Sequence, residues 1–195
     1  MRIGVIAAGS LLLVGSAVAA QTSLPQVREG FTASFGFGAG SGGVSCTNCS
    51  TTRETGVSGY LRLGSAVRPG LIVAGETNGF VKSIDGGQVN FSFYSAALQW
   101  YPQPASGFYL KGNAGFATSQ FVVEDFGFGT LELESNGFAA GVGAGYDLRV
   151  GRMFSLTPYV NLMTSVRSEA RFLGQSLGEK LNPNLLQFGI GFTWH

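Results

Sequence analysis

The sequence predicts an all-β protein: an eight-stranded antiparallel up-and-down transmembrane β-barrel. Three observations indicate this fold. The final segment, residues 185–195, alternates between large apolar and small or polar residues, which is the period of a strand. Eight such segments are joined by connections that alternate in length, as in barrels with long loops on one side and short turns on the other. The chain contains 31 glycines and only 12% charged residues, yet after its start no apolar run approaches the ~20 residues of a membrane helix.

The closing segment, LLQFGIGFTWH, shows why we expect the apolar side chains to face outward. One parity carries only large apolar residues and the other carries small or polar ones. A narrow eight-stranded barrel has room inside for glycine, serine and threonine, and large apolar side chains on its outside then face lipid. The large set is Leu186, Phe188, Ile190, Phe192 and Trp194.

The first 20 residues have the form of a secretory signal peptide. They begin with the cation Arg2, continue with an apolar run and end in the small residues SAVAA, so we expect them to be removed. Cleavage after Ala19 and cleavage after Ala20 both satisfy the small-residue rule. Residues 21–28 are a polar N-terminal lead-in, and residues 29–195 form the barrel domain, a one-domain length.

The first three strands follow the lead-in. Residues 29–39 alternate cleanly and form the first strand, and a long polar stretch separates them from the second strand at residues 55–66. A Pro-Gly pair at residues 69–70 marks a tight turn. The third strand spans residues 71–79.

The fourth strand changes phase. After a medium loop at residues 80–88, residues 89–101 begin with Val89, Phe91 and Phe93 on one parity and end with Leu98 and Trp100 on the other. This slip requires either a β-bulge near residues 94–95 or an upper half that stands above the lipid.

The remaining strands are predicted at residues 107–118, 135–148, 153–166 and 185–195. Residues 119–134 keep some alternation, so the fifth and sixth strands are expected to continue as a hairpin above the membrane, turning near residues 125–129. Residues 167–183 are predicted to be a long polar loop. Pro158 cannot donate to a sheet ladder, so we expect a local bulge or an open bond there.

Aromatic residues gather near the predicted strand ends on the side of the short turns. Such a cluster is typical of an interfacial aromatic girdle. The predicted girdle is Phe31, Trp100, Phe108, Tyr146, Phe154 and Trp194.

The segments AALQWYP, FYLKGNAGFA and FGIGFTWH, together with this pattern, resemble the small eight-stranded outer-membrane barrels of the OmpA-like transmembrane domain and OmpX-type family. The resemblance covers residues 29–195. It implies location in the outer membrane of a Gram-negative envelope, with outer-membrane lipid and lipopolysaccharide as neighbours. It also implies recognition by the barrel-insertion machinery, although here Trp194 is followed by His195 instead of ending the chain.

Four inward-facing charged residues are the most informative polar positions. A lone ion in a narrow lumen would be costly, so ions there are expected in pairs. The short turn places Arg62 opposite Glu76, while Lys111 and Asp147 lie near short turns. These residues form either an electrostatic gate for small solutes or a structural core that fills the lumen.

The sequence offers no catalytic or cofactor site. Cys46 and Cys49 lie in a Gly/Ser-rich loop and form either a small-loop disulfide or free or metal-binding thiols. His195 is the single histidine, and without a nucleophile and a third group to hold it, it does not indicate an enzyme. We expect no cofactor.

Charge and loop composition bear on partners. Without Arg2 the chain has 11 basic and 11 acidic residues, which gives no footprint for nucleic acid. Apolar residues at Phe121, Val122, Val123, Phe126 and Phe128 indicate an external surface for a partner or a cluster that packs on itself. Charges at Arg167, Glu169 and Arg171 are solvated or pair with lipopolysaccharide phosphates.

Three functions follow as hypotheses. The first is an integral outer-membrane barrel with a structural or surface-interaction role and no catalysis. The alternative is a narrow channel for ions or small solutes. The second alternative is a soluble periplasmic barrel that binds an apolar ligand, in which case the large residues would face inward. Detergent-dependent solubility separates the last from the others.

Overall fold

Ten strands make up the fold of this computed structural model, which describes residues 28–45, 53–84, 87–125, 129–172, 175–180 and 182–195. Within this part of the chain, no helix is long and apolar enough to cross a bilayer. The strands are β1 (Gly30–Ser45), β2 (Arg53–Arg68), β3 (Leu71–Ile84), β4 (Gly87–Trp100), β5 (Phe108–Asp125), β6 (Gly129–Tyr146), β7 (Leu148–Arg149), β8 (Phe154–Phe172), β9 (Gln175–Lys180) and β10 (Asn182–Trp194).

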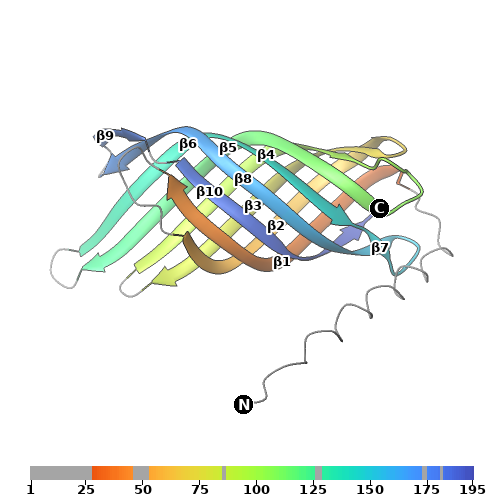
Figure 1. Cartoon of the computed structure of the whole chain (residues 1–195), viewed down its shortest axis with the longest axis horizontal. Coiled ribbons are helices and arrows are strands. Elements are labelled where there is room, and N and C mark those ends of the chain that lie inside the picture. Colours follow the sequence, from red (N-terminus) through yellow and green to blue (C-terminus); the bar gives the residue numbers. More distant parts are fainter. Residues whose placement is uncertain (1–27, 46–52, 85–86, 126–128, 173–174, 181) are drawn as a thin grey trace, which may run out of the picture.

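Eight long strands close into a barrel. Consecutive long strands pair antiparallel, and β10 pairs with both β8 and β1, so the sheet has no open seam (Figure 1). The short strands β7 and β9 each pair with β8. The predicted fold class is therefore confirmed.

Two predicted loops are wrong, because the strands run farther than the apolar pattern suggested. Residues 80–88 are mostly strand, since β3 ends at Ile84 and β4 begins at Gly87. Residues 167–183 contain the end of β8 and all of β9, which pairs with it. The predicted hairpin of β5 and β6 is confirmed: the two strands pair up to Asp125 and Gly129.

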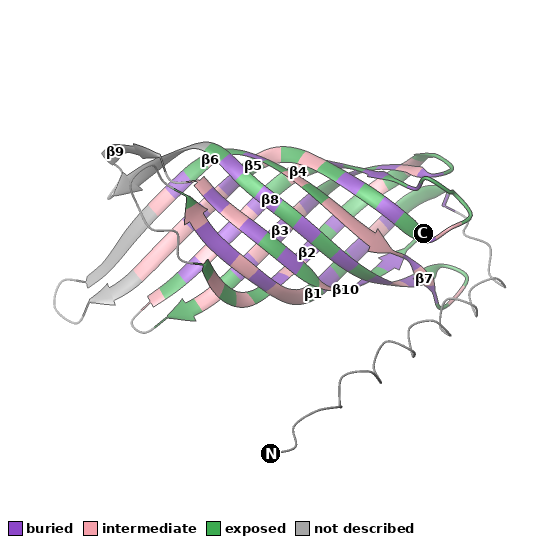
Figure 2. Ribbon diagram, viewed as in Figure 1, coloured by how far each residue is buried: buried purple, intermediate pink, exposed green. Residues whose placement is uncertain are grey.

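Exposure alternates along the strands, as Figure 2 shows by its alternating bands of colour. The outward apolar positions form a band, which we call the lipid band. On β5 it runs over residues 108–116 and on β10 over residues 186–194. This length matches the ~9–11 residues that a tilted strand needs to cross a bilayer. The large apolar side chains thus face outward in this half of the barrel.

Above the lipid band, apolar and polar residues exchange faces, while exposure keeps alternating as before. On β4, Tyr94 is exposed at the band's upper edge, whereas Phe93, Phe91 and Val89 above it are buried inside the barrel. The outward residues of this upper part, at positions 88, 90 and 92, are polar. A strand leaving lipid for water must exchange its polar and apolar faces, because each face then meets the opposite solvent.

No β-bulge accompanies this reversal. The register of β4 is continuous from Gly87 to Trp100 against both β3 and β5. A bulge near residues 94–95 is therefore wrong, which leaves the alternative expectation, an upper half standing above the lipid.

The expected open bond at Pro158 is confirmed. Pro158 pairs with Ile190 of β10, but the ladder on its other side is interrupted between Tyr159 and Leu156. The segment that joins β6 to β7 stays paired on its opposite side, toward β5: the backbone N–H of Asp147 donates to the carbonyl of Gly107, at 2.9 Å. The gap separates β6 from β7.

Candidate functional site

A buried charged layer fills the barrel within the lipid band. Arg62 on β2 and Glu76 on β3 are direct cross-strand neighbours, and Arg62 Nε donates to Glu76 Oε2 at 2.6 Å. Lys111 reaches from β5 to the same carboxylate, with Nζ 2.6 Å from Oε1. All three side chains are buried. One carboxylate therefore pairs with two cations from different walls of the barrel.

Amide side chains complete this layer. Asn78 and Asn113 donate to Glu76 Oε1 at 2.8 and 3.1 Å. Arg62 Nη1 donates to Gln99 Oε1 at 2.7 Å. Because Glu76 accepts so many hydrogen bonds, its charge is held by fixed donors rather than by water. Chemically, this arrangement favours a rigid polar core over a mobile base.

Asp147 lies apart from this layer, beyond the lower end of β6. Its carboxylate accepts hydrogen bonds from Tyr101 at 2.7 Å and Thr157 at 2.8 Å. The basic side chains around it come from the two ends of the barrel domain: Arg28 lies at 3.6 Å and the imidazole of His195 at 3.3 Å. The prediction placed Lys111 and Asp147 near short turns, and the structure gives them separate partners.

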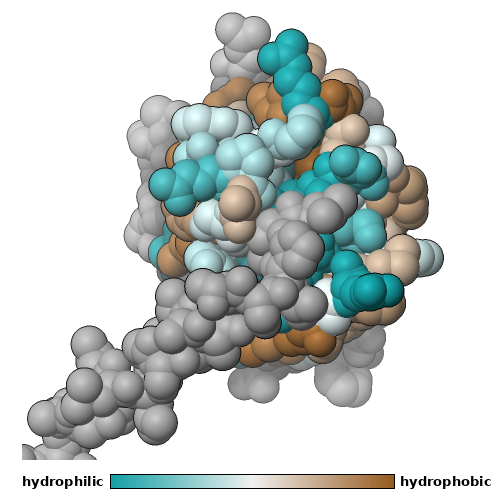
Figure 3. Space-filling view, turned by 90° about the vertical axis from the view of Figure 1, so that its right-hand side faces the viewer, coloured by the Kyte–Doolittle hydropathy of each residue, from teal (hydrophilic) through white to brown (hydrophobic). Residues whose placement is uncertain are grey.

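Arg28, which precedes β1, connects this end of the chain to the turn before β5 at the lower opening of the barrel. Its guanidinium donates to the carbonyls of Pro104 and Ser106 at 2.7 and 2.9 Å and lies 3.6 Å from the ring centre of Tyr101. Figure 3, which looks onto this end, shows hydrophilic side chains gathered there with hydrophobic ones around the sides. We call Arg28, Tyr101, Asp147, Thr157 and His195 the lower cluster.

The environment of Asp147 favours its charged form. Burial by itself would raise the pKa of the Asp147 carboxyl, but His195, the Tyr101 hydroxyl and Arg28 outweigh burial and hold this pKa below its usual value. The cluster is therefore ionic at neutral pH.

Sequence reasoning missed several members of these layers. Gln99 and Tyr101 share the inward parity of β4, and His195 continues the inward parity of Thr193. A prediction that continued the inward-facing positions to the last residue of each strand would have included these three residues. Arg28 carried no such signal, because it precedes the first strand.

The predicted girdle residues lie at the lower ends of their strands. Phe154 and Trp194 are cross-strand partners with ring centres 6.1 Å apart. The residues with large exposed side chains are Phe31, Trp100, Phe108, Phe154 and Trp194, and Tyr146 is half-exposed. Their role as membrane anchors stays a prediction.

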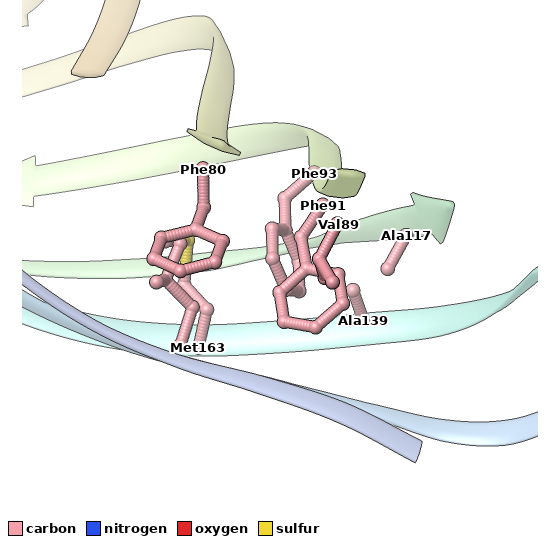
Figure 4. Close-up of a cluster of buried hydrophobic side chains, with 8 residues drawn as sticks. Phe80, Val89, Phe91, Phe93, Ala117, Ala139 and Met163 are labelled. Atoms are coloured by element: carbon pink, nitrogen blue, oxygen red, sulfur yellow. The ribbon is translucent and has the colours of Figure 1, made fainter. Parts of the chain in front are cut away.

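An apolar cluster fills the barrel above the charged layer (Figure 4). Phe80 stacks on Phe91 with ring centres 5.5 Å apart, and Phe121 meets Phe91 at 6.0 Å. Phe121 is thus part of this interior and not an exposed binding residue. Below it, the hollow beside Phe93 has no room for a water molecule. The cluster comprises Phe80, Val89, Phe91, Phe93, Ala117, Ala139, Met163 and Leu185.

Some predicted residues lie outside the described part of the chain. These are Cys46, Cys49, Phe126 and Phe128, and the side chains of Val123, Arg167, Glu169 and Arg171. In the part that the structure describes, no group of three or more histidine, cysteine, aspartate or glutamate residues could hold a metal ion.

Known structures share this architecture. Ail, the attachment invasion locus protein of Yersinia pestis, is 13% identical with a TM-score of 0.61, covering 85% of this chain and 99% of Ail. Neisserial surface protein A is 12% identical with a TM-score of 0.57, covering 86% of this chain and 98% of that protein. Ail in complex with the heparin analogue sucrose octasulfate gives 12% identity, a TM-score of 0.57, and 85% and 99% coverage.

These neighbours are small eight-stranded outer-membrane barrels, so the predicted resemblance is confirmed. A search of curated proteins finds no match. The family model described as the autotransporter β-domain matches residues 29–172, which is more than half of the chain. The protein is an outer-membrane β-barrel and belongs to the autotransporter β-domain family.

Proposed function

We propose that this barrel is a non-catalytic surface-binding protein, whose part above the lipid band holds a partner outside the cell. The observation that carries the proposal is the height of β5, β6 and β8, which have 18, 18 and 19 residues. About nine residues suffice to cross the lipid. The rest of these strands serves no membrane-spanning purpose. We call the part of the barrel above the lipid band the external platform.

The external platform is built to stay folded in water. On β5, residues 117–125 extend past the last lipid-facing aromatic, Phe116, and at ~3.3 Å per residue they reach about 30 Å along the strand. The first two outward neighbours above Phe116, Thr118 and Gln120, are polar, and the next one is Val122. The apolar cluster packs inside. A preformed surface loses little conformational entropy on binding, which favours affinity.

The charge of the external segments favours a cationic partner. Residues 40–56, 80–92, 117–137 and 164–185 contain 5 basic and 8 acidic residues, which gives 5 − 8 = −3. The β5–β6 hairpin contributes four acidic residues and no basic one. Ail has been crystallised with a heparin analogue, but a negative hairpin would repel such a polyanion. Complementary charge steers a partner of the opposite sign.

The alternative of a narrow channel has less support. Charged side chains cross the lumen at the level of Glu76, and the apolar cluster lies directly above them. An ion would have to cross both layers. Catalysis also has less support, because the single histidine, His195, is buried beside Asp147.

Export and insertion belong to the same proposal. Residues 1–20 would direct export as a signal peptide and be removed, and the barrel-insertion machinery would place residues 29–195 in the outer membrane. Residues 1–27 lie outside the described part of the chain.

A shortened hairpin tests the proposal. Ser119 and Ser135 are cross-strand partners, so residues 120–134 can be replaced by Asn-Gly, which forms a tight hairpin turn. Cells displaying the full-length or shortened barrel are compared for binding to host cells and to a lysine-rich peptide. We expect the shortened barrel to lose both, while heat-modifiable migration on gels shows that it still folds.

A charge variant separates shape from electrostatics. Replacing Glu124, Glu132 and Glu134 by glutamine leaves the hairpin in place, so this variant should lose peptide binding in low salt. Undiminished binding by the shortened barrel would refute the proposal. We expect the full-length and the shortened barrel to show equal conductance in planar bilayers.

A further inference from the structure

A hollow of about 400 Å³ opens on the lipid-facing wall of β1, β2 and β3. These strands are neighbours in the barrel (Figure 1). The floor is made by outward-facing small residues, with Gly59 and Gly79 as cross-strand partners beside Thr77. The walls are the large apolar residues Phe37, Val57, Leu61 and Val81.

The glycines leave real space in this wall. A methyl group added at Gly79, or at Gly75 farther down β3, would meet no atom within 4 Å. Elsewhere the lipid band carries bulky side chains such as Phe116 and Phe188, and a second hollow, of about 350 Å³, lies beside Phe108 near the lower end of the barrel, far from Arg53. The hollow on β1, β2 and β3 therefore has the width and the apolar lining to seat a hydrocarbon chain of the external leaflet.

A cation lies directly above the hollow on the same strand. Arg53, at the external end of β2, points outward and spreads across β1 toward β10. Its Nε donates to Ser41 Oγ at 3.0 Å and its Nη2 to the Ser41 carbonyl at 2.5 Å, and its Nη1 contacts Asn184. All of these acceptors are neutral. Among the described residues, no carboxylate forms a salt bridge with Arg53.

Arg53 gives this wall its charge. Lys82, at the external end of β3, lies on the inward face, because its cross-strand partner on β4 is Val89, which is buried inside the barrel. The acidic hairpin belongs to β5 and β6, which are separated from β2 by β3 and β4. Arg53 is thus an outward cation above the hollow, away from the acidic hairpin.

We infer that this wall is a binding site for a phosphorylated, multiply acylated lipid of the external leaflet, the chemistry of lipid A. One acyl chain lies in the hollow and a phosphate lies on Arg53. Arginine suits this role, because its planar guanidinium keeps N–H groups free for a phosphate after binding the neutral acceptors. The site lies on the barrel wall, so it does not depend on the proposed external partner.

The site can be tested with the purified full-length barrel in detergent micelles. Native mass spectrometry measures retention of bisphosphorylated lipid A and of the same lipid with both phosphates removed. We expect the phosphorylated lipid to bind tighter by at least about fivefold, since one cation near a membrane surface contributes roughly that factor.

Two pairs of variants separate the hollow from its surroundings. Gly79→Leu fills the hollow and should weaken lipid A binding about tenfold, while Gly112→Leu is its matched control. Gly112 likewise lies on the outward face of its strand, β5, and also has nothing within 4 Å of an added methyl group. Arg53→Gln should weaken binding about fivefold, with Arg53→Lys retaining most of it. Arg68→Gln, at the opposite end of β2, is the control.

Heat-modifiable migration confirms that each variant is folded, and Thr77→Leu serves in place of Gly79→Leu if the latter is not. Selective weakening by the hollow and Arg53 variants supports the site. Equal binding of the two lipid forms would overturn the inference. So would equal weakening by Gly79→Leu and Gly112→Leu, or retention of lipid A no greater than that of detergent.

Discussion

Replacing Glu76 by glutamine tests the charged layer most directly. Glutamine keeps the shape of the side chain but removes the negative charge that pairs with Arg62 and Lys111, both at 2.6 Å. The Glu76 side chain has no exposed surface, so water cannot replace it. Breaking a buried ion pair leaves an uncompensated charge and costs roughly 3–5 kcal/mol. Because two cations lose their partner here, we expect at least about 3 kcal/mol in the free energy of unfolding.

The assay is urea unfolding in phospholipid vesicles, followed by tryptophan fluorescence and by migration on gels. Adding Lys111→Gln to Glu76→Gln removes one of the stranded cations, so the double variant should recover about 1–2 kcal/mol. Glu134→Gln is the control: this carboxylate is half-buried above the lipid band and accepts a 3.3 Å hydrogen bond from Gln120. It should cost less than about 1 kcal/mol. If Glu76→Gln is as mild as Glu134→Gln, the reasoning about the charged layer is wrong.

Three further predictions concern other layers. Phe91→Ala, inside the apolar cluster, should cost about 3–5 kcal/mol of unfolding free energy, whereas Phe116→Ala, which faces lipid, should cost about 1–2 kcal/mol in the same urea assay. The folded-state pKa of Asp147 is lowered, so its charged form contributes to the free energy of unfolding above the unfolded pKa of ~3.9. This stability is lost as pH falls through the lower folded value. Unfolding curves at pH 7 and pH 3 should therefore differ less in Asp147→Asn than in the native protein. A methyl group at Gly189 would overlap the backbone of β1, whereas one at Gly75 would meet nothing within 4 Å. Gly189→Ala should therefore slow the closure of the barrel, measured by the rate at which the folded band appears on a gel. Gly75→Ala should leave that rate unchanged.

Local patterns predicted much of the barrel. The alternation of β10, from Leu186 to Trp194, gave its outward face, because a strand's period depends only on the chain itself. The neighbouring positions of Arg62 and Glu76 also followed, since a short turn fixes the register of the two strands it joins. Contacts that cross the lumen did not follow. Lys111 reaches Glu76 from β5, and this depends on the diameter and shear of the closed barrel.

The β4 strand shows where sequence reasoning stops. Its phase change at Tyr94 was visible, but the sequence admitted both a bulge and a change of solvent. Only the continuous register against β3 and β5 decided for the solvent change. The same ambiguity hid the ends of β3 and β8, because strand residues outside lipid lose the apolar outward face that marks a membrane strand.

By itself, the sequence determined that this protein is a membrane barrel of eight strands with its bulky apolar residues outward in lipid. The tertiary structure alone decided what fills the interior: which ions share Glu76, which aromatic rings occupy the external platform, and how Arg28 and His195 meet at Asp147. The physical reason is the separation in sequence of the residues that make each kind of contact. Alternation is set between neighbours along the chain, whereas interior contacts join residues far apart in sequence, which come together only when the last strand pairs with the first.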